Sequence, residues 1–315
     1  MARAQTVFPA VAPTEYHESL MRTTNNTSSH VNRPRRHHFV PRFYLEGFCA
    51  DDARVVAVYD RLRNAYRAQR PTEVAHRRDY YAYEDDQGNL VFDIEIGLGE
   101  VETAASAAIL KLDNEEQLTA DDKLVLATYV AFQFTRTPAY AAWLGEFRAQ
   151  FAQNARPEEI DALPNPQDPA ADRGAALGAM LRHAPRFADV FLNLNWTIWR
   201  RDSDRQSFVT TDCPVSVLQT QRQEANIYAG VGILLPDVIT LLPLSQASAL
   251  AMSGIGNRID SRTLTPDWVR RVNLAIVNQA QHFVFGRDMA LVESLVRRTG
   301  IERREWQPPL QAQPL

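Results

Sequence analysis

Two adjacent histidines, His37 and His38, are the residues near the start of the chain best suited to chemistry. Imidazole acts as a general base or a metal ligand near neutral pH, and the neighbouring Arg42 could bind phosphate or carboxylate. Pro41 favours an extended segment, in which successive side chains point in opposite directions. One histidine could then face a cavity, and the alternative is that both satisfy buried backbone acceptors.

Asp212 is the second candidate, because it follows the predicted strand Ser207–Thr211 directly and precedes Pro214. A carboxylate at a strand end can bind a metal ion, orient a histidine or act as a base. It can equally cap the turn through its own backbone, which is a common use of Asp. The adjacent Cys213 is a possible nucleophile, although a small buried hydrophobic residue is the better interpretation.

Two helical sets of polar residues extend this group. Glu95 and Glu102 are seven residues apart and share a helix face, as do Gln133 and Arg136, which are three apart. A buried arginine needs a partner, and either glutamate is a natural one. The pair could be a structural salt bridge or part of an anion-binding element.

These residues form one predicted site. The catalytic candidates are His37, His38 and Asp212; the substrate-binding candidates are Arg42, Gln133 and Arg136; and the metal ligands are Asp60, Glu95 and Glu102. We expect a divalent metal, Mg²⁺, Mn²⁺ or Zn²⁺, as cofactor, although no regular metal motif is present. The chain has no glycine-rich nucleotide motif, so we expect no nucleotide cofactor. His-His-x-Val-Pro resembles the histidine element of HNH nucleases, whose second half is missing here.

Composition is that of an ordinary globular protein, with 315 residues, 45% hydrophobic residues and a net charge of −4. Charge is segregated, because residues 33–78 hold 11 arginines against 5 acids and residues 79–172 hold 19 acids against 5 bases. The basic segment could pack beside the acidic one or line a ligand groove. No apolar run is long enough for a membrane span, and two cysteines suit a reducing compartment, so we expect a cytoplasmic protein that does not bind membranes.

The hydrophobic periodicity predicts an α+β fold in which a helical centre packs with a small N-terminal sheet and a C-terminal antiparallel sheet. We expect a disordered tail at 1–32, a single domain at 33–305 with a helical lobe at about 93–193 and a sheet lobe at about 194–290, and a second tail at 306–315. The expected strands and hairpins are Val55–Asp60 with a return after Asn64, Tyr80–Tyr83 with Leu90–Phe92, Trp196–Arg200 with Ser207–Thr211, Ile239–Leu244, and Ala249–Met252. The expected helices are Asp93–Leu112, a helix capped by Thr119 and interrupted at Pro138, Ala139–Ala155, one that begins at Ala175 after a linker, Pro266–Gln281, and Met289–Thr299.

Several motifs in this order resemble a mostly bacterial family of unknown function, the domain-of-unknown-function family numbered 4238. The matching segments are His37–Leu45, Val58–Asp60, Ile94-Glu95 with Val101-Glu102, Gln133–Pro138, Val209–Pro214, Leu242–Ser245 and Val272-Asn273. The resemblance implies one continuous domain in which His, Glu, Arg and Asp side chains converge, and it names no substrate.

The residue types favour a metal-assisted hydrolase, most plausibly a phosphodiesterase or nuclease, acting on nucleic acid or another phosphate-containing substrate. The alternative is a non-catalytic binding or defence-associated module with a structural polar network. An open polar cluster would favour the enzyme, and a buried, mutually satisfied one the module. The sequence does not fix the oligomeric state.

Overall fold

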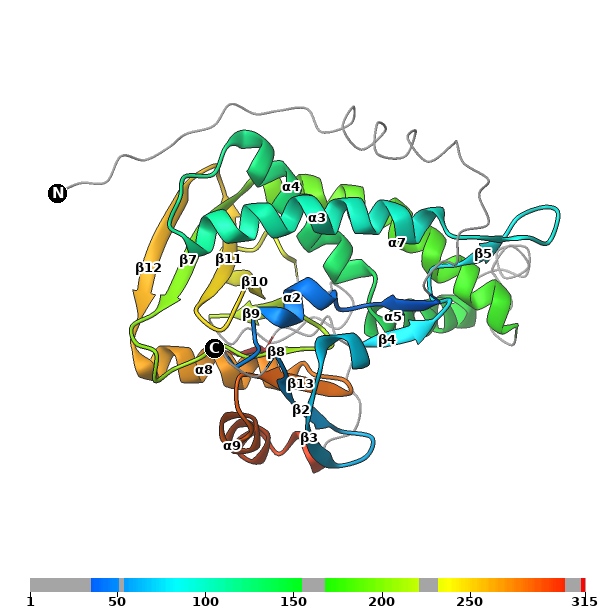
Figure 1. Ribbon diagram of the computed structural model, residues 1–315. Helices are drawn as coiled ribbons and strands as arrows, with labels where there is room; N and C mark the ends of the chain where they lie inside the picture. The colour runs from blue at the N-terminus through cyan, green and yellow to red at the C-terminus, as the bar shows by residue number, and fades with distance from the viewer. Residues whose placement is uncertain (1–34, 51–53, 155–167, 221–231, 304–312, 315) are drawn as a thin grey trace.

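The computed structural model describes residues 35–50, 54–154, 168–220, 232–303 and 313–314 (Figure 1). The expected tail at 1–32 and most of the linker lie outside the described residues. Strands and helices occur in separate runs along the chain, and the fold is α+β as predicted. One hydrophobic core contains residues from Phe39 to Ile301, so the helical part and the sheets are packed together.

A six-stranded sheet forms one side of the molecule. Its strands, in spatial order, are β12 (Ile259–Leu264), β7 (Leu194–Arg201), β11 (Ser248–Ile255), β10 (Val238–Pro243), β9 (Ser216–Gln219) and β14 (Gln313–Pro314). The four central strands are antiparallel, as expected, whereas the edge strands β12 and β14 run parallel to their neighbours. Two residues of the expected C-terminal tail therefore form a strand.

The remaining strands form three smaller sheets near the N-terminal part of the domain. A four-stranded antiparallel sheet has the order β3 (Ala65–Gln69), β2 (Val56–Asp60), β13 (Phe283–Gly286) and β8 (Thr210–Thr211). Two antiparallel ribbons are formed by β1 (Arg36–His38) with β4 (His76–Arg78), and by β5 (Tyr83–Glu84) with β6 (Leu90–Val91).

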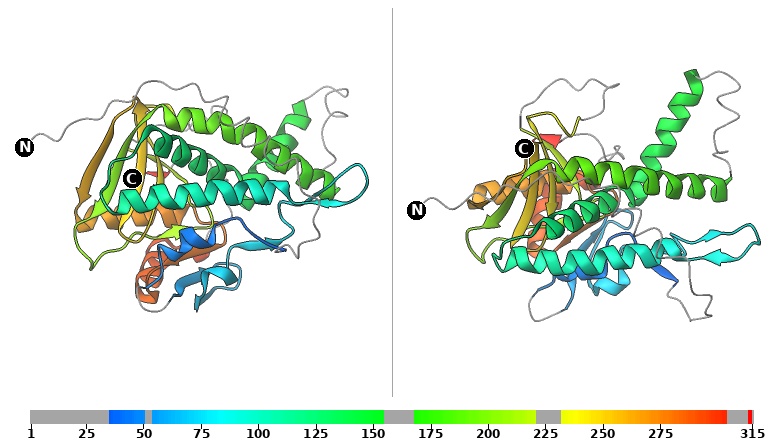
Figure 2. Two further views of the ribbon diagram at one scale, coloured as in Figure 1. Left: turned by 45° about the horizontal axis from the view of Figure 1, so that its top comes forward. Right: turned by 90° about the horizontal axis from the view of Figure 1, so that it is seen from above.

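Helices α3 (Asp93–Asp113), α4 (Ala120–Thr135) and α7 (Pro169–Leu192) pack side by side and extend away from the six-stranded sheet (Figures 1 and 2). Helix α5 (Pro138–Asn154) projects from this body in Figure 2. The short helix α2 (Arg42–Glu46) follows β1, and a 3-10 turn η1 (Pro71–Glu73) precedes β4. In the sequence, α8 (Pro266–Asn278) precedes β13 and α9 (Met289–Thr299) follows it. A second 3-10 turn, η2 (Ile301–Arg303), follows α9. No helix in the described part of the chain is both long and apolar enough to cross a membrane.

Local sequence signals account for the starts of α4, α5 and α7. Thr119 caps α4, since its hydroxyl accepts the N–H of Asp122 while the Asp122 carboxylate accepts the N–H of Thr119. Pro138 begins α5 instead of kinking a continuous helix. Asp168 caps α7, so this helix begins inside the expected linker.

The expected hairpin between Trp196–Arg200 and Ser207–Thr211 is wrong. Strand β7 pairs with β11 and β12, whereas β8 pairs with β13 in the other sheet. Residues 207–218 are all buried, because this segment passes through the core from one sheet to the other. A continuously buried segment shows no alternation that would reveal its partner.

Lys123 of α4 is a buried cation in this core, with 1% of its surface exposed. Its ammonium donates to Oδ1 of Asn257 at 2.7 Å and to the carbonyl of Leu194 at 3.4 Å, and lies 5.2 Å from the ring centroid of Trp196. Burial lowers the pKa of Lys123 from 10.5 to about 8. Folding therefore makes the neutral amine of Lys123 more favourable than it is in the unfolded chain.

We predict that Lys123→Met removes a pH-dependent contribution to stability. The unfolded chain holds the Lys123 proton up to about pH 10, whereas the folded chain releases it near pH 8. The free energy of unfolding of the wild type should therefore rise, relative to the variant, by about 2–3 kcal/mol between pH 7 and pH 10. Urea unfolding of both proteins at each pH measures this difference, and a constant difference would contradict it.

Candidate functional site

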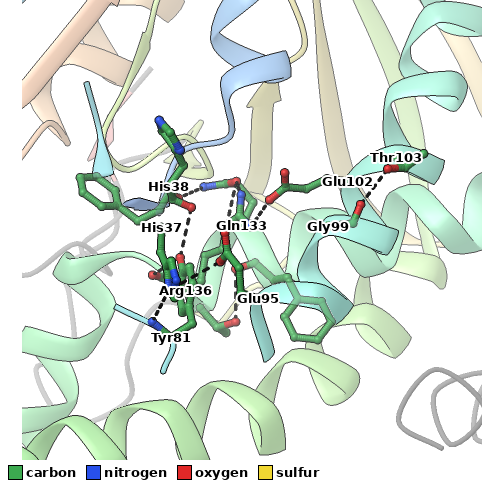
Figure 3. Close-up of polar contacts among 12 residues, drawn as sticks. His37, His38, Tyr81, Glu95, Gly99, Glu102, Thr103, Gln133 and Arg136 are labelled. Atoms are coloured by element: carbon green, nitrogen blue, oxygen red, sulfur yellow. Dashed lines mark hydrogen bonds and ion pairs between the residues drawn. The ribbon is translucent and has the colours of Figure 1, made fainter. Parts of the chain in front are cut away.

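The candidate site is formed where β1, α3 and α4 meet (Figure 3). His37 of β1 is fully buried, and its Nδ1 atom accepts the backbone N–H of Tyr81 at 3.0 Å. The Tyr81 ring stacks on the imidazole, with centroids 5.8 Å apart. Because Nδ1 is an acceptor, the proton of the neutral ring lies on Nε2. His37 is thus held in one tautomer by the backbone.

Arg136, at the end of α4, is the positive centre of the site, and only 1% of its side chain is exposed. Its Nη1 donates to Oε1 of Glu102 at 2.7 Å, and its Nε and Nη2 both donate to Oε1 of Gln133. Gln133 in turn donates from Nε2 to the carbonyl of Phe39 at 2.9 Å. The buried guanidinium therefore connects α3 and α4 to the chain after β1.

Glu95 is the second carboxylate beside this arginine. Its Oε2 atom lies 3.9 Å from Nδ1 of His37, and 34% of its side chain is exposed. Burial raises the pKa of Glu95 from 4.5 to about 7; Arg136 opposes this shift and Glu102 adds to it. The direct ion pair with Arg136 is made by Glu102. The arginine therefore does not cancel the effect of burial on Glu95, whose pKa stays at about 7.

His38, the last residue of β1, is a neutral imidazole that lies against His76 of β4. Burial, and next the proximity of His76, lower the pKa of His38 to about 4. The rings of His38 and His76 meet edge to face with centroids 5.4 Å apart. Within the described residues, the buried Nε2 of His38 has no hydrogen-bond partner. This nitrogen can bind a water molecule or a ligand.

Arg42 lies at the surface. Its side chain is 61% exposed and its Nε forms an ion pair with Glu46 one turn along α2, at 3.3 Å. Its positive charge is one of the influences that lower the pKa of His38. Arg42 is thus placed to meet a ligand from solvent, as a substrate-binding residue would be.

Asp212 is placed in a different part of the fold from the histidines. Its carboxylate accepts the N–H groups of Gln281 and His282 at 2.9 and 2.8 Å, and its own N–H donates to the carbonyl of Phe283. Burial raises the pKa of Asp212, while the electrostatic influence of His282 and these N–H groups oppose the shift. Asp212 therefore joins the chain after β8 to the start of β13 by long-range hydrogen bonds, whereas the turn-capping alternative placed its partners in its own turn.

The Asp212 motif nevertheless approaches the histidine segment through the core. The hydroxyl groups of Tyr44 in α2 and Thr210 in β8 are hydrogen-bonded at 2.8 Å. This contact joins the two sequence motifs by a pair of hydroxyls, whereas the Asp212 carboxylate is directed to β13. The Cys213 thiol is buried and its pKa is raised well above the usual value by burial, so it is poorly suited to be a nucleophile.

Asp60 also has structural partners. It lies at the end of β2, opposite Phe283 of β13, and accepts from Nη2 of Arg67 at 2.8 Å and from the N–H of Arg63 at 3.2 Å. The structure therefore groups Glu95 and Glu102 but places Asp60 on the four-stranded sheet. Within the described ranges, no group of three His, Cys, Asp or Glu side chains could hold a metal ion.

Sequence reasoning missed two members of the site. The sequence pattern predicts Tyr81 in a hairpin, whereas the structure shows that it donates its N–H to His37 and its hydroxyl to the carbonyl of His38 at 3.4 Å. His76 contacts His38 because β4 pairs with β1. The only signal for His76 was its position beside arginines in a basic segment.

The chain was also compared with known proteins. The model of the family described as "Protein of unknown function (DUF4238)" matches residues 36–290, which include every residue of the site. No curated protein and no solved structure matches the chain. Since the match covers most of the chain and spans the histidine, glutamate, arginine and aspartate motifs in order, the protein belongs to this family of unknown function.

Proposed function

We propose that the protein is a hydrolase that cleaves a phosphodiester, with Glu95 as the base that activates water. The observation that carries this proposal is the state of Glu95, a partly exposed carboxylate with a pKa of about 7 beside a buried arginine and the buried imidazole of His37. A general base is most effective when its pKa is near the working pH. Perturbed carboxylates of this kind are concentrated at functional sites.

In the proposed reaction, ionised Glu95 accepts a proton from water while the water oxygen forms a bond to phosphorus. The bond from phosphorus to the leaving oxygen breaks, the leaving oxygen takes a proton from solvent, and Glu95 returns its proton to solvent. The charge of Arg136 favours an anionic substrate, and Arg42 can bind it at the surface.

A divalent metal, Mg²⁺, Mn²⁺ or Zn²⁺, remains part of the proposal only as an addition to the assay. The described residues provide Glu95 and Glu102 as hard ligands, but Glu102 is paired with Arg136 and no third ligand is grouped with them. This donor set does not fit a protein-held metal. No step of the reaction is therefore assigned to one.

The non-catalytic binding module is the second candidate, and burial of the network favours it. His37, Gln133 and Arg136 are buried; His37 bonds to the backbone of Tyr81, Arg136 bonds to Gln133 and Glu102, and Gln133 bonds to the backbone of Phe39. Such a network could fix the positions of β1, α3 and α4 for a defence-associated or other binding role without any reaction. The two candidates differ in whether Glu95 acts on a substrate.

We further propose that the protein works in the cytoplasm. Both cysteines, Cys49 and Cys213, are unpaired and buried, which suits a reducing compartment.

We predict that Glu95→Gln lowers kcat/KM for an activated phosphodiester such as bis(p-nitrophenyl) phosphate by about a hundredfold or more, because the amide cannot accept the proton. For the wild type, kcat/KM should fall below an apparent pKa of about 7, where Glu95 becomes protonated. Rates are measured with and without Mg²⁺, Mn²⁺ and Zn²⁺. Glu100→Gln, on an exposed part of the same helix, is the matched control. Absence of wild-type hydrolysis under every metal condition, or equal rates for the two variants, would favour the binding module.

Stability depends on the Arg136 network in both candidate functions. We predict that Arg136→Met costs about 3 kcal/mol of unfolding free energy, because it leaves the Glu102 carboxylate and the Gln133 amide without their partner. Adding Glu102→Leu to this variant should recover part of the loss. Urea unfolding at pH 7 measures both effects, and a single variant as stable as the wild type would show that the ion pair contributes little.

A further inference from the structure

One face of the β1–β4 ribbon carries two positively charged arginines and two histidines. The antiparallel register places Arg36 opposite Arg78 and His38 opposite His76. Residues directly opposite share a face, as do residues two apart on one strand. Both arginines are exposed, and 72% of the Arg78 side chain is accessible to solvent.

This arrangement concentrates positive charge that the fold does little to neutralise. Like charges directly opposite each other destabilise a strand pair. The nearby Asp79 already accepts from both Nε and Nη2 of Arg35, and Arg78 shares one of its oxygens at 3.4 Å. Among the described residues, Arg36 and Arg77 have no ion-pair partner. Nearby imidazoles respond to this charge, since burial, followed by Arg36, lowers the pKa of His76.

We propose that this face, defined by Arg36, His38, His76 and Arg78 and called the basic ribbon, binds the phosphodiester backbone of a polynucleotide. The inference rests on the proposed function in treating that polynucleotide as the substrate. Strand β1 provides both elements, since its central residue, His37, belongs to the site beside Glu95. Because successive side chains of a strand point in opposite directions, the basic ribbon lies on the face of β1 opposite His37, so the bound backbone and the proposed site lie on the two faces of one short strand.

The extent of the basic ribbon favours a polymer over a single phosphate. The His38–His76 pair lies two residues from the Arg36–Arg78 pair, roughly 6.6 Å along the strands, and Arg42 follows beyond His38. Guanidinium groups bind phosphate oxygens in pairs, so the Arg36–Arg78 pair on one side of His38 and Arg42 on the other match separate phosphates of one chain. These residues offer no apolar anchor of the kind that membrane-surface binding uses.

Contacts made only to phosphates predict binding that is independent of sequence and strongly dependent on salt. The test measures fluorescence anisotropy of a labelled DNA single strand, its duplex and an RNA of the same sequence over a range of NaCl concentrations. The ribbon variant is Arg36→Gln with Arg78→Gln. The matched control is Arg297→Gln with Arg298→Gln, which removes the same charge from an exposed part of α9.

We expect the ribbon variant to bind at least one of these polynucleotides about tenfold more weakly than the wild type, with a salt slope smaller by about two, whereas the control variant binds as the wild type does. Weaker binding by the ribbon variant is measured without any cleavage, so it supports the inference even if the proposed function fails. Two results would overturn the inference while leaving the proposed function intact. These are hydrolysis of the small phosphodiester by a wild type that binds no polynucleotide, and equal weakening by the ribbon and control variants. Equally tight binding of polyglutamate or of anionic lipid vesicles would overturn it as well, because the surface would not select a phosphodiester backbone.

Discussion

The buried charge of Arg136 is the constraint around which the N-terminal half of the fold is organised. A guanidinium that is almost completely removed from water must have an acidic partner and acceptors for its remaining N–H groups. Glu102 supplies the carboxylate from α3, and Gln133 supplies an amide oxygen from the same helix as Arg136. Gln133 then donates to Phe39, so satisfying one charge fixes the positions of α3, α4 and the segment after β1 together.

The titration of Glu95 follows from an imbalance of charge in this arrangement. One arginine faces two glutamates, and the direct ion pair is made by Glu102. Glu95 remains partly buried beside neutral His37, so its ionised form is less favourable than in water. The same network is therefore rigid in its buried part and titratable at its edge. The stable core and the candidate base are consequences of a single charge balance.

Features set by local sequence could be predicted, and features set by long-range strand pairing could not. The Thr119 cap, the shared face of Gln133 and Arg136, and the need of Arg136 for a glutamate all follow from helical spacing. Asp212 could not be placed, because its partners come from β13, a four-residue strand between two helices that the periodicity did not reveal. The family match spans residues 36–290, which contain these motifs, but the hydrogen bonds show which of them are neighbours.

The carboxyl pKa of Glu95 tests the central claim most directly, because it reports the charge balance without assuming any activity. The titration can be followed by the ¹³C chemical shift of side-chain carboxyl groups in labelled protein, with Glu95→Gln used to assign the resonance. The account predicts a midpoint near pH 7. A midpoint near the ordinary value of 4.5 would show that Glu95 is an unperturbed surface carboxylate, and would contradict both the charge balance and the role of Glu95 as the base.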